Sequence, residues 1–301
     1  MKHIISASRR TDIPAFFTGW FIKRLAQGSV LVKNPYSGKV MEASLRPANV
    51  HSVVLWSKDF HPLLRRIEEV EKHAPNLFFH FTITGIPKTL EQHTPEVKEA
   101  VKDFIFISKR YSPGHIIWRF DPIVITDSLP FEFYEESFKR LAEALRGHAA
   151  ECYLSFMEPY KKVLRNFEKY AVHKLIELSI EEKQEYAKKI VKAAEKNNMK
   201  LFACCNEYLV NGDIGQAKCI DAGKLAALFG TEGLSTKSAP TREGCGCAKV
   251  IDIGAYDTCE HGCLYCYANS DKEKAKKFLK TFNPEWKGLG FEAEKREGEL
   301  F

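Results

Sequence analysis

The sequence lacks any long apolar run. No stretch approaches the ~18 consecutive apolar residues that a membrane span requires, and the N-terminus reaches the charged pair Arg9 and Arg10 after only a short apolar stretch. We therefore expect a cytoplasmic protein with no membrane segment. A reducing compartment disfavours structural disulfides, so the nine cysteines are predicted to bind metal or to take part in catalysis.

Several common catalytic and binding motifs are also absent. There is no Walker loop, no Gly-x-Gly-x-x-Gly after a strand and no Gly-x-Ser-x-Gly, and the ten histidines are scattered without a His-x-x-x-His arrangement. The charge balance of 45 basic against 39 acidic residues leaves only +6. A net charge of +6 is compatible with a phosphate-bearing partner but is lower than expected for a dedicated nucleic-acid-binding protein. A nucleic-acid partner is therefore possible but not favoured.

The pattern of apolar residues indicates the fold class. Short apolar or alternating runs recur along the 301 residues, and several are separated by segments of helical period, such as Tyr134, Phe138 and Leu141. Eight alternations of strand and helix predict an α/β protein with a single (β/α)8 TIM-like barrel, closed or nearly so. The predicted strands are Ile4–Ser8, Val30–Lys33, Ser52–Trp56, Leu77–Thr84, His115–Phe120, Glu151–Phe156, Lys200–Cys204 and Lys249–Ile253.

Local signals refine this organisation. Asp12 precedes a predicted helix as a cap, residues 178–197 read as a long amphipathic helix, and residues 34–49 have little room for a helix. No linker divides the chain, which predicts a barrel domain over 1–282, including the cysteine cluster loop 245–267, and a loosely held tail over 283–301. Residues 271–281 carry five lysines and are predicted to form the solvated face of the last helix, although they could attract an anionic partner.

Cys259, Cys263 and Cys266 form a Cys-x3-Cys-x2-Cys loop with an aromatic residue just before the last cysteine. Three thiolates this close can bind three irons of a [4Fe–4S] cluster and leave the fourth iron open to a small molecule. Zinc would need a fourth ligand, and His261 lies inside the short loop, where it would strain to reach the same metal. The spacing favours iron–sulfur over zinc and over unmetallated thiols.

The loop and the residues after it read CEHGCLYCYAN over positions 259–269. This run resembles the cluster loop of radical S-adenosylmethionine enzymes, in particular the photoproduct-lyase-like branch. The resemblance implies a [4Fe–4S] cluster on the three cysteines whose open iron binds S-adenosylmethionine. It also implies that one electron from a donor of ferredoxin or flavodoxin type releases a 5′-deoxyadenosyl radical. With SASRRTD over 6–12, the whole chain looks like an uncharacterised radical-SAM-like family with C-terminal cysteines, an oxygen-sensitive enzyme without an assigned substrate.

The position of the loop departs from that family pattern. In most relatives the cysteines follow the first barrel strand, whereas here they follow the last predicted one, 249–253. In a closed barrel the eighth strand lies beside the first, so a circularly permuted barrel would leave the loop in an equivalent place. All loops after the strands would then face one mouth, where active sites of such barrels lie.

The turn after the first strand departs as well, because Ser8-Arg9-Arg10-Thr11-Asp12 stands where the family often has a Gly-Gly-Glu-like turn. Ser8 and Asp12 could accept from the ammonium of S-adenosylmethionine, while an arginine could meet its carboxylate. Polar residues at the other strand ends complete the predicted site. The candidate catalytic residues are Arg9, Arg10, Asp12, Arg119, Asp121 and Glu158, and the candidate cofactor-binding residues are Ser8, Thr84, Gly85, Tyr265 and Asn206.

Two of these candidates have a stated geometric reason. Arg119 and Asp121 are two apart on one predicted strand, so they share a face and could form a charge pair, either near the ligand or purely structural. Gly85 after Thr84 would let the backbone approach a nucleoside closely, although a simple turn explains a lone glycine just as well.

A second set of cysteines remains. Neighbouring residues in a strand face opposite sides, so only one of Cys204 and Cys205 should reach a given site, and Cys205, nearer the strand end, is the predicted one. Cys204 and Cys152 are then predicted core residues. Four thiolates suit an auxiliary [4Fe–4S] cluster or a structural zinc site, with ordinary buried cysteines as the alternative. The predicted set is Cys205, Cys219, Cys245 and Cys247.

Three functions follow from these patterns. The leading hypothesis is a radical S-adenosylmethionine enzyme with an auxiliary metal site. The second is an iron–sulfur redox or sensing protein without S-adenosylmethionine chemistry, which the atypical turn over 8–12 keeps open. The third is a zinc-binding, nucleic-acid-associated protein.

Overall fold

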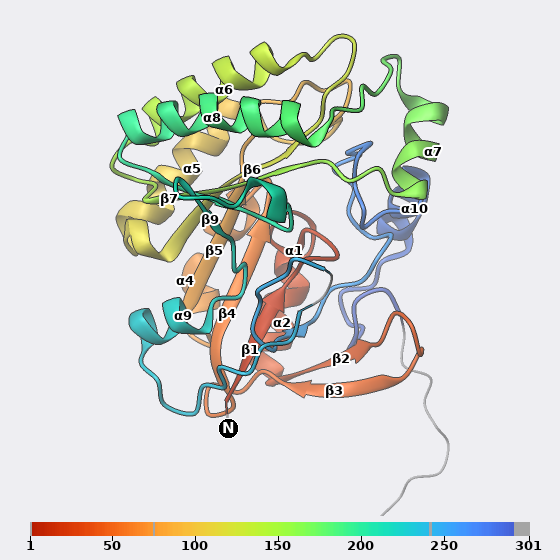
Figure 1. Ribbon diagram of the computed structural model, residues 1–301. Helices are drawn as coiled ribbons and strands as arrows, with labels where there is room; N and C mark the ends of the chain where they lie inside the picture. Colours follow the sequence, from red (N-terminus) through yellow and green to blue (C-terminus); the bar gives the residue numbers. More distant parts are fainter. Residues whose placement is uncertain (1, 75, 241–242, 292–301) are drawn as a thin grey trace, which may run out of the picture.

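The computed structural model describes residues 2–74, 76–240 and 243–291. Its centre is an eight-stranded sheet with the order β10-β1-β4-β5-β6-β7-β8-β9, in which every neighbouring pair is parallel (Figure 1). This confirms an α/β fold with a large parallel sheet. The strands of the sheet are β1 (His3–Ala7), β4 (Val50–Ser57), β5 (Leu77–Thr82), β6 (Ile116–Ile123), β7 (Glu151–Phe156), β8 (Lys200–Ala203), β9 (Ile214–Gln216) and β10 (Ile251–Asp252).

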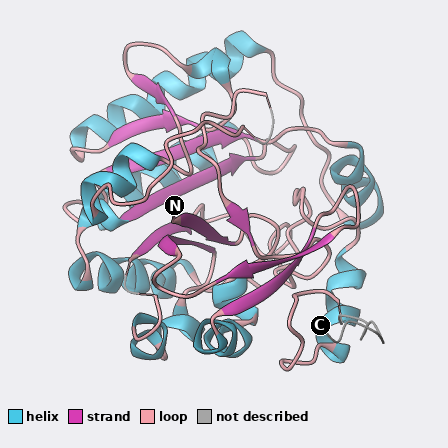
Figure 2. Cartoon of the chain, turned by 90° about the horizontal axis from the view of Figure 1, so that it is seen from below, coloured by secondary structure: helices cyan, strands magenta, loops and turns pink. Residues whose placement is uncertain are grey.

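Helices connect most of the strands, as parallel pairing requires, and Figure 2 shows them grouped around the sheet. No strand pairing joins β9 to β10 in the described part of the chain, so closure of the sheet into a barrel stays a prediction. The helices are α1 (Ile13–Phe16), α2 (Thr18–Gln27), α3 (His61–Leu64), α4 (Ile67–Glu71), α5 (Val97–Arg110), α6 (Phe131–Ala144), α7 (Lys161–Tyr170), α8 (Ile180–Lys196), α9 (Ala222–Phe229) and α10 (Lys272–Thr281).

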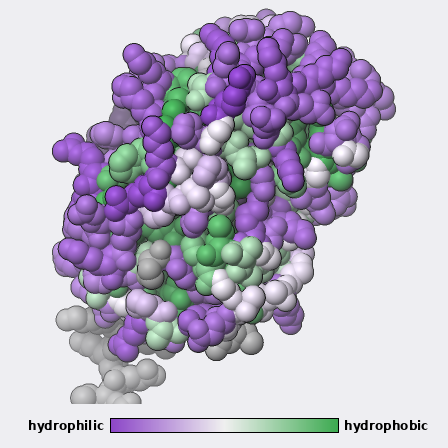
Figure 3. Space-filling model, turned by 90° about the vertical axis from the view of Figure 1, so that its left-hand side faces the viewer, coloured by the Kyte–Doolittle hydropathy of each residue, from purple (hydrophilic) through white to green (hydrophobic). Residues whose placement is uncertain are grey.

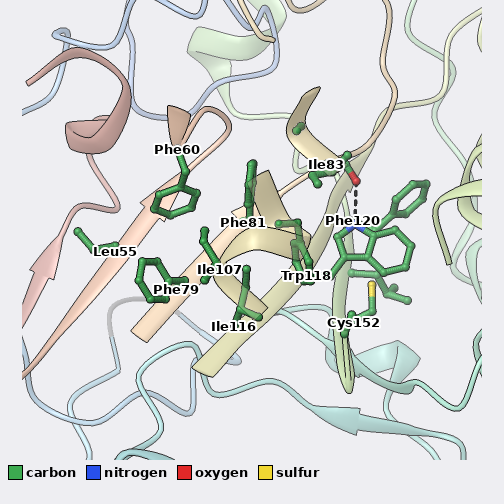
Figure 4. Packing of buried hydrophobic residues seen from close by; sticks show 14 of the residues in the cluster. Leu55, Phe60, Phe79, Phe81, Ile83, Ile107, Ile116, Trp118, Phe120 and Cys152 are labelled. Carbon is green, nitrogen blue, oxygen red and sulfur yellow. Dashed lines mark hydrogen bonds between the residues drawn. The ribbon is translucent and has the colours of Figure 1, made fainter. Parts of the chain in front are cut away.

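The outer face of the sheet packs against the helices and forms the main core. Phe79, Phe81, Trp118 and Phe120 are fully buried there, and the Trp118 indole N–H donates to the carbonyl of Ile83 at 2.9 Å (Figure 4). Aromatic side chains of this size supply most of the apolar area that stabilises such a core. The predicted core residue Cys152 lies among them and is fully buried.

The inner face of the sheet carries the alternate residues of the same strands. Ile4, Val54, Phe78, Ile117 and Tyr153 lie there in one buried cluster. This face is covered by the chain between β9 and β10 rather than by long helices, through buried residues such as Ile220, Leu225 and Ala248. Several cysteines, among them Cys204, Cys219 and Cys247, lie in this buried cluster on the inner face of the sheet.

One predicted barrel strand does not enter the sheet. Val30–Lys33 is part of β2 (Ser29–Lys33), which pairs antiparallel with β3 (Val40–Ser44) as a separate two-stranded ribbon. The prediction was wrong because a further strand, β3, follows β2 after residues 34–39 only. This connection is too short for a parallel crossover and allows only an antiparallel hairpin. Asn34 closes the turn instead by accepting from the backbone N–H groups of Tyr36 and Ser37 at 2.9 and 3.0 Å.

The missing strand is β9, which the sequence analysis did not predict. It has three residues, one of them Gly215, and so gives no periodic signal. Its glycine is required by the close approach of Phe202, whose ring would lie 2.8 Å from an added Cβ. The predicted last strand is present as β10, and it pairs parallel with β1, the neighbour that the permuted arrangement expects.

The predicted helix signals are confirmed. Asp12 caps α1 by accepting from the Ala15 N–H, and Ser179 and Glu182 form a capping box at the start of α8. The stretch 283–291 of the predicted tail is packed rather than loose, because Leu289 is buried and the Trp286 carbonyl accepts from Trp20 at 2.8 Å. Residues 292–301 lie outside the described residues.

The face at the left of Figure 1 is largely hydrophilic toward its rim, with residues of intermediate and apolar character across its middle (Figure 3). Among the described helices, none combines the length and the apolar character that crossing a bilayer requires.

Candidate functional site

Cys259, Cys263 and Cys266, the loop cysteines, lie at the sheet edge where the parallel strands end. Their loop follows β10 and is held by backbone pairing with the segment after β5: Leu264 donates to the Leu90 carbonyl at 3.0 Å, and His93 donates to the His261 carbonyl at 2.9 Å. All three cysteines are free and half-buried. Burial raises the pKa of all three thiols.

His261 does not face the loop cysteines as a fourth ligand. One ring nitrogen lies 2.7 Å from the Asp12 carboxylate and the other lies 3.2 Å from the His93 carbonyl. Both nitrogens are therefore used to position the loop. This agrees with the expectation that His261 would not complete a zinc tetrahedron.

Asp12, a predicted catalytic residue, holds several segments together. Its carboxylate accepts from the Ser57 hydroxyl at 2.7 Å and the Lys58 backbone N–H at 2.9 Å, besides contacting His261 and capping α1. It is buried, and its contacts link the turn after β1 to the end of β4 and to the cysteine loop.

Ser8, Arg9 and Arg10 converge on Asp252 at the end of β10. The Asp252 carboxylate accepts from the Ser8 hydroxyl at 2.7 Å, the Arg9 N–H at 2.9 Å and the Arg10 Nε at 3.0 Å. Burial alone would raise the pKa of Asp252, but Arg10, the Arg9 N–H and Ser8 hold it below its usual value. Sequence reasoning missed Asp252; the available signal was an acidic residue at the end of a predicted strand that the permuted barrel places beside the first strand and its two arginines.

Glu91 is a second residue that the sequence did not reveal. It is buried and accepts from the Lys58 ammonium at 3.0 Å, from the Thr84 hydroxyl at 3.2 Å and from the Tyr265 hydroxyl. Two predicted cofactor-binding residues, Thr84 and Tyr265, therefore meet at this carboxylate. Burial disfavours the charged form of Lys58, but the Glu91 carboxylate raises its pKa, which keeps a cation beside the loop cysteines.

Gly85 has a structural explanation. Its φ is +73°, and a Cβ added there would lie 2.5 Å from the Ser137 hydroxyl of α6. The close approach that the sequence suggested is thus between this turn and α6. Among the other predicted residues, Asn206 accepts from the Phe156 N–H at 2.7 Å and donates to the exposed Glu158 at 3.0 Å, which joins the ends of β7 and β8.

Arg119 and Asp121 form the charge pair that their spacing predicted. Arg119 Nε lies 3.0 Å from the Asp121 carboxylate, and the guanidinium lies over the rings of Trp56 and Tyr153 on the inner face. Burial raises the pKa of Asp121, and Arg119 opposes this shift. Whether the pair serves a ligand stays a prediction.

The other cysteines of interest are five neighbours on the inner face of the sheet, which we call the inner cysteines. The Cys204 and Cys219 sulfurs lie 3.4 Å apart. Cys205, Cys247 and Cys245 are near enough to interact electrostatically with this pair or with each other. The predicted four are brought together, but Cys204, predicted as core, is among them. The inner cysteines are Cys204, Cys205, Cys219, Cys245 and Cys247.

The register of β8 explains why Cys204 belongs to this set. Ala203 pairs with Leu154 on the outer face, so the next residue, Cys204, turns to the inner face beside Tyr153. Cys205 has a left-handed φ of 58° and is only half-buried. Alternation along a strand correctly implies that Cys204 and Cys205 point to opposite faces. Which of the two points inward depends on the register of β8 against β7, which the sequence does not show.

Lys58 interacts electrostatically with Cys263 and Asp121, and Asp121 does so with Cys204. Within the described ranges, no group of three or more His, Cys, Asp or Glu side chains is arranged to hold a single metal ion.

Comparison with known proteins gives little on activity. No curated protein matches the chain. A solved structure of a pyruvate carboxylase variant from Rhizobium etli, crystallized without acetyl coenzyme A, matches at 12% identity and a TM-score of 0.33, over 91% of this chain and 23% of that one. This likeness is too weak to assign a fold or an activity. One family matches residues 4–268, a range that contains all nine cysteines. The chain therefore belongs to the family described as "Domain of unknown function (DUF1848)".

Proposed function

We propose that the chain is a radical S-adenosylmethionine enzyme whose [4Fe–4S] cluster is held by Cys259, Cys263 and Cys266. The observation that carries this proposal is the set of three free thiols on one loop at the carboxyl edge of the parallel sheet, with both nitrogens of the nearby His261 engaged elsewhere. Ligands and cofactors of parallel α/β sheets bind at this edge.

The donor set fits such a cluster better than a single ion. Thiolates are the ordinary ligands of iron–sulfur clusters, and each binds its own iron. A single zinc ion would need a fourth ligand beside the three thiolates, and both ring nitrogens of the nearby His261 are engaged elsewhere. When bound, the cluster would supply the electron that cleaves S-adenosylmethionine to a 5′-deoxyadenosyl radical.

The residues around the loop would position and protect this chemistry. Lys58, kept charged by Glu91, places a cation beside Cys263 and would offset the negative charge of bound thiolates. The contact between Asp12 and His261 fixes the loop against the end of β4. Leu264 and Tyr265 are buried and would help to exclude water.

The turn after β1 is proposed to meet the amino-acid part of S-adenosylmethionine through Arg9. Arg10 and Ser8 donate directly to Asp252, whereas the Arg9 guanidinium lies 3.8 Å from it. Arg9 is also less buried than Arg10. It is therefore the cation of this turn with most freedom to bind a carboxylate.

Closure of the sheet into a circularly permuted (β/α)8 barrel is the finer part of the proposal. Its support is the parallel pairing of β10 with β1, which places the cysteine loop next to the turn after β1. Between β9 and β10, the described residues 217–240 and 243–250 lie over the inner face, where a closed barrel has its interior.

The proposed reaction needs an external one-electron donor, and α7 and α10 offer it a basic surface. The two helices lie next to each other at the right of Figure 1, joined by Lys169 and Tyr170, which both contact Asp271. α7 has four basic residues against one acidic and α10 has five against one, net +3 and +4, compared with +6 for the whole chain. The exposed Leu164 lies in α7, and Lys162 interacts with Cys266. An acidic electron carrier of ferredoxin or flavodoxin type is the partner that this surface favours.

Anaerobic reconstitution tests the proposal. The protein loaded with iron and sulfide, reduced with dithionite, is expected to convert S-adenosylmethionine to 5′-deoxyadenosine, and Cys263→Ala is expected to abolish this. Cys152→Ala, in the outer core, is the matched control and should retain the activity. Uptake of iron and sulfide without any 5′-deoxyadenosine would contradict the enzyme proposal.

A second candidate is an iron–sulfur redox or sensing protein that never binds S-adenosylmethionine. The observation in its favour is that Ser8, Arg10 and Asp12 are already hydrogen-bonded to protein groups. Calorimetry on the loaded protein separates the two functions. Heat of S-adenosylmethionine binding that disappears in the Arg9→Met variant supports the enzyme, and no heat in either protein supports the sensor.

A further inference from the structure

The inner cysteines come from three separate segments that meet over the inner face of the sheet. Cys204 and Cys205 follow β8, Cys219 follows β9, and Cys245 and Cys247 precede β10. Sequence separations of 14 to 43 residues between Cys204 or Cys205 and the others are bridged by the fold alone.

Backbone hydrogen bonds fix each of the three segments. Cys204 N–H donates to the Leu154 carbonyl at 2.9 Å, and Ala248 N–H, next to Cys247, donates to the Ile220 carbonyl, next to Cys219, at 2.9 Å. Ile220 N–H also points at the Cys247 sulfur at 3.4 Å. The sulfur positions are therefore set by ordered main chain.

A buried cation faces two of these sulfurs. Arg119 Nη1 lies 3.2 Å from the Cys219 sulfur, and Nη2 lies 3.6 Å from the Cys204 sulfur. Arg119 is buried, as are Cys204, Cys219 and Cys247. Asp121 already balances the charge of Arg119, and the guanidinium N–H groups directed at the two sulfurs would in addition stabilise thiolates that form when a metal binds.

We infer that Cys204, Cys219, Cys245 and Cys247 hold a second iron–sulfur cluster on the inner face, and that Cys205 is not a ligand. Cys204 is chosen over its neighbour because its sulfur contacts Cys219 and faces Arg119. Cys245 and Cys247 are two apart, and the Cys247 sulfur accepts from the N–H of Ile220, the residue after Cys219, at 3.4 Å. Four thiolates without a nitrogen donor match the ligand set of such clusters.

Zinc would accept the same four thiolates, and the 3.4 Å between the Cys204 and Cys219 sulfurs lets both bind one metal ion. Iron–sulfur is preferred because the loop cysteines are proposed to hold a cluster of the same kind, and this preference rests on that proposed function. The inference does not depend on the reaction with S-adenosylmethionine, and the metal analysis below separates iron from zinc.

The test begins from a background without the loop cluster. The variant carrying Cys259→Ala, Cys263→Ala and Cys266→Ala is purified and reconstituted without oxygen, and its iron, sulfide and zinc contents are measured together with the visible and electron paramagnetic resonance spectra. We expect retained iron and sulfide with an iron–sulfur spectrum, at about half the iron of the wild type if both clusters are of one type.

Two neighbouring substitutions then separate the ligands. In that background Cys204→Ser is expected to lose at least nine-tenths of the iron, while Cys205→Ser and the control Cys152→Ser keep it. Circular dichroism checks that each variant is folded. Absence of iron from the background variant, zinc in place of iron, or loss of iron in Cys205→Ser but not in Cys204→Ser would each overturn the inference.

A measurement on the wild type covers the case in which Cys204→Ser does not fold. The reconstituted and the metal-free proteins are alkylated without denaturant, and each cysteine is followed by mass spectrometry. Protection of Cys219, Cys245 and Cys247 together with Cys204, but not of Cys205, on cluster loading supports the inference. Equal labelling of Cys204 and Cys205 in both states contradicts it.

Discussion

At the scale of single residues, Asp252 organises the turn after β1. It accepts from the side chains of Ser6, Ser8 and Arg10 and from the Arg9 N–H, and so ties the first strand to the last. A buried carboxylate with this many donors depends on its charge, because each donor loses its partner when the carboxylate is protonated.

This dependence predicts an effect of pH on stability. The pKa of Asp252 in the folded state lies below its unfolded value of ~3.9, so the ionised form stabilises the fold above about pH 4. The contribution is lost as the pH falls through the folded-state pKa. Urea unfolding should show that Asp252→Asn costs about 1–3 kcal/mol at pH 6, and that the gap to the wild type narrows below pH 4. An unchanged gap across this range would contradict the account.

Gly85 gives a second residue-scale prediction. Gly85→Ala should destabilise the fold by about 2–3 kcal/mol, because its left-handed φ disfavours a side chain and the new Cβ overlaps the Ser137 hydroxyl. Adding Ser137→Ala should recover part of this loss, measured by denaturant unfolding of all four proteins. If the double variant is no more stable than Gly85→Ala, the contact with α6 is not the cause.

The sequence predicted contacts of the candidate site only between residues that are close together in the sequence. The loop cysteines and the pair of Arg119 and Asp121 lie close in sequence, and their proximity followed directly. Glu91 and Asp252 meet their partners across the sheet, at 33 and 242 residues from Lys58 and Arg10. Such contacts depend on the register between neighbouring strands. The register of β8 against β7 also determines that Cys204, rather than Cys205, points to the inner face.

At the scale of elements, the order of strands followed from periodicity wherever a strand was long and apolar. β4, β5, β6 and β7 lie where the alternation predicted them. The prediction for β2 was half right: residues 30–33 do form a strand, but the short connection to β3 allows only antiparallel pairing outside the main sheet. β9 could not be predicted because three residues carry no period.

The basic surface of α7 and α10 gives the element-scale prediction. Lys162→Glu with Lys276→Glu should slow 5′-deoxyadenosine formation driven by reduced flavodoxin at least five-fold, because the charge reversal repels an acidic carrier. Dithionite, a small reductant, should drive the variant at the wild-type rate. Added salt should slow the flavodoxin reaction of the wild type as well.

Charge reversal of α8, through Lys192→Glu with Lys196→Glu, is the matched control, since α8 packs against α6. An equal slowing by this control would show that no specific surface is involved. Tight binding of single-stranded nucleic acid to the α7 and α10 surface, lost in the charge-reversed variant, would assign the surface to that partner instead.

At the scale of the whole molecule, we expect the stability of the fold to be separate from the proposed metal chemistry. The main core consists mostly of aliphatic and aromatic side chains under the helices, and among the described cysteines of the two sets only Cys263 is packed against it. The loop is also held by backbone bonds to Leu90 and His93 and by the contact of His261 with Asp12. The sheet is therefore expected to form without metal.

Metal removal tests this separation. Treatment with a chelator under reducing conditions should remove the iron and any activity while leaving the far-ultraviolet circular dichroism within about a tenth of its original value. Air should bleach the visible spectrum in the same way. Cooperative unfolding on metal removal, as in small zinc modules, would show that the clusters carry the fold.

The central claim is that the loop cysteines hold a cluster with an iron open to S-adenosylmethionine. The most direct measurement is the electron paramagnetic resonance spectrum of the reduced cluster in a Cys204→Ser, Cys219→Ser variant, which isolates the loop site. The account predicts a [4Fe–4S] signal whose g values shift when S-adenosylmethionine is added, and no signal when Cys263→Ala is introduced as well. A signal that S-adenosylmethionine leaves unchanged would contradict the claim.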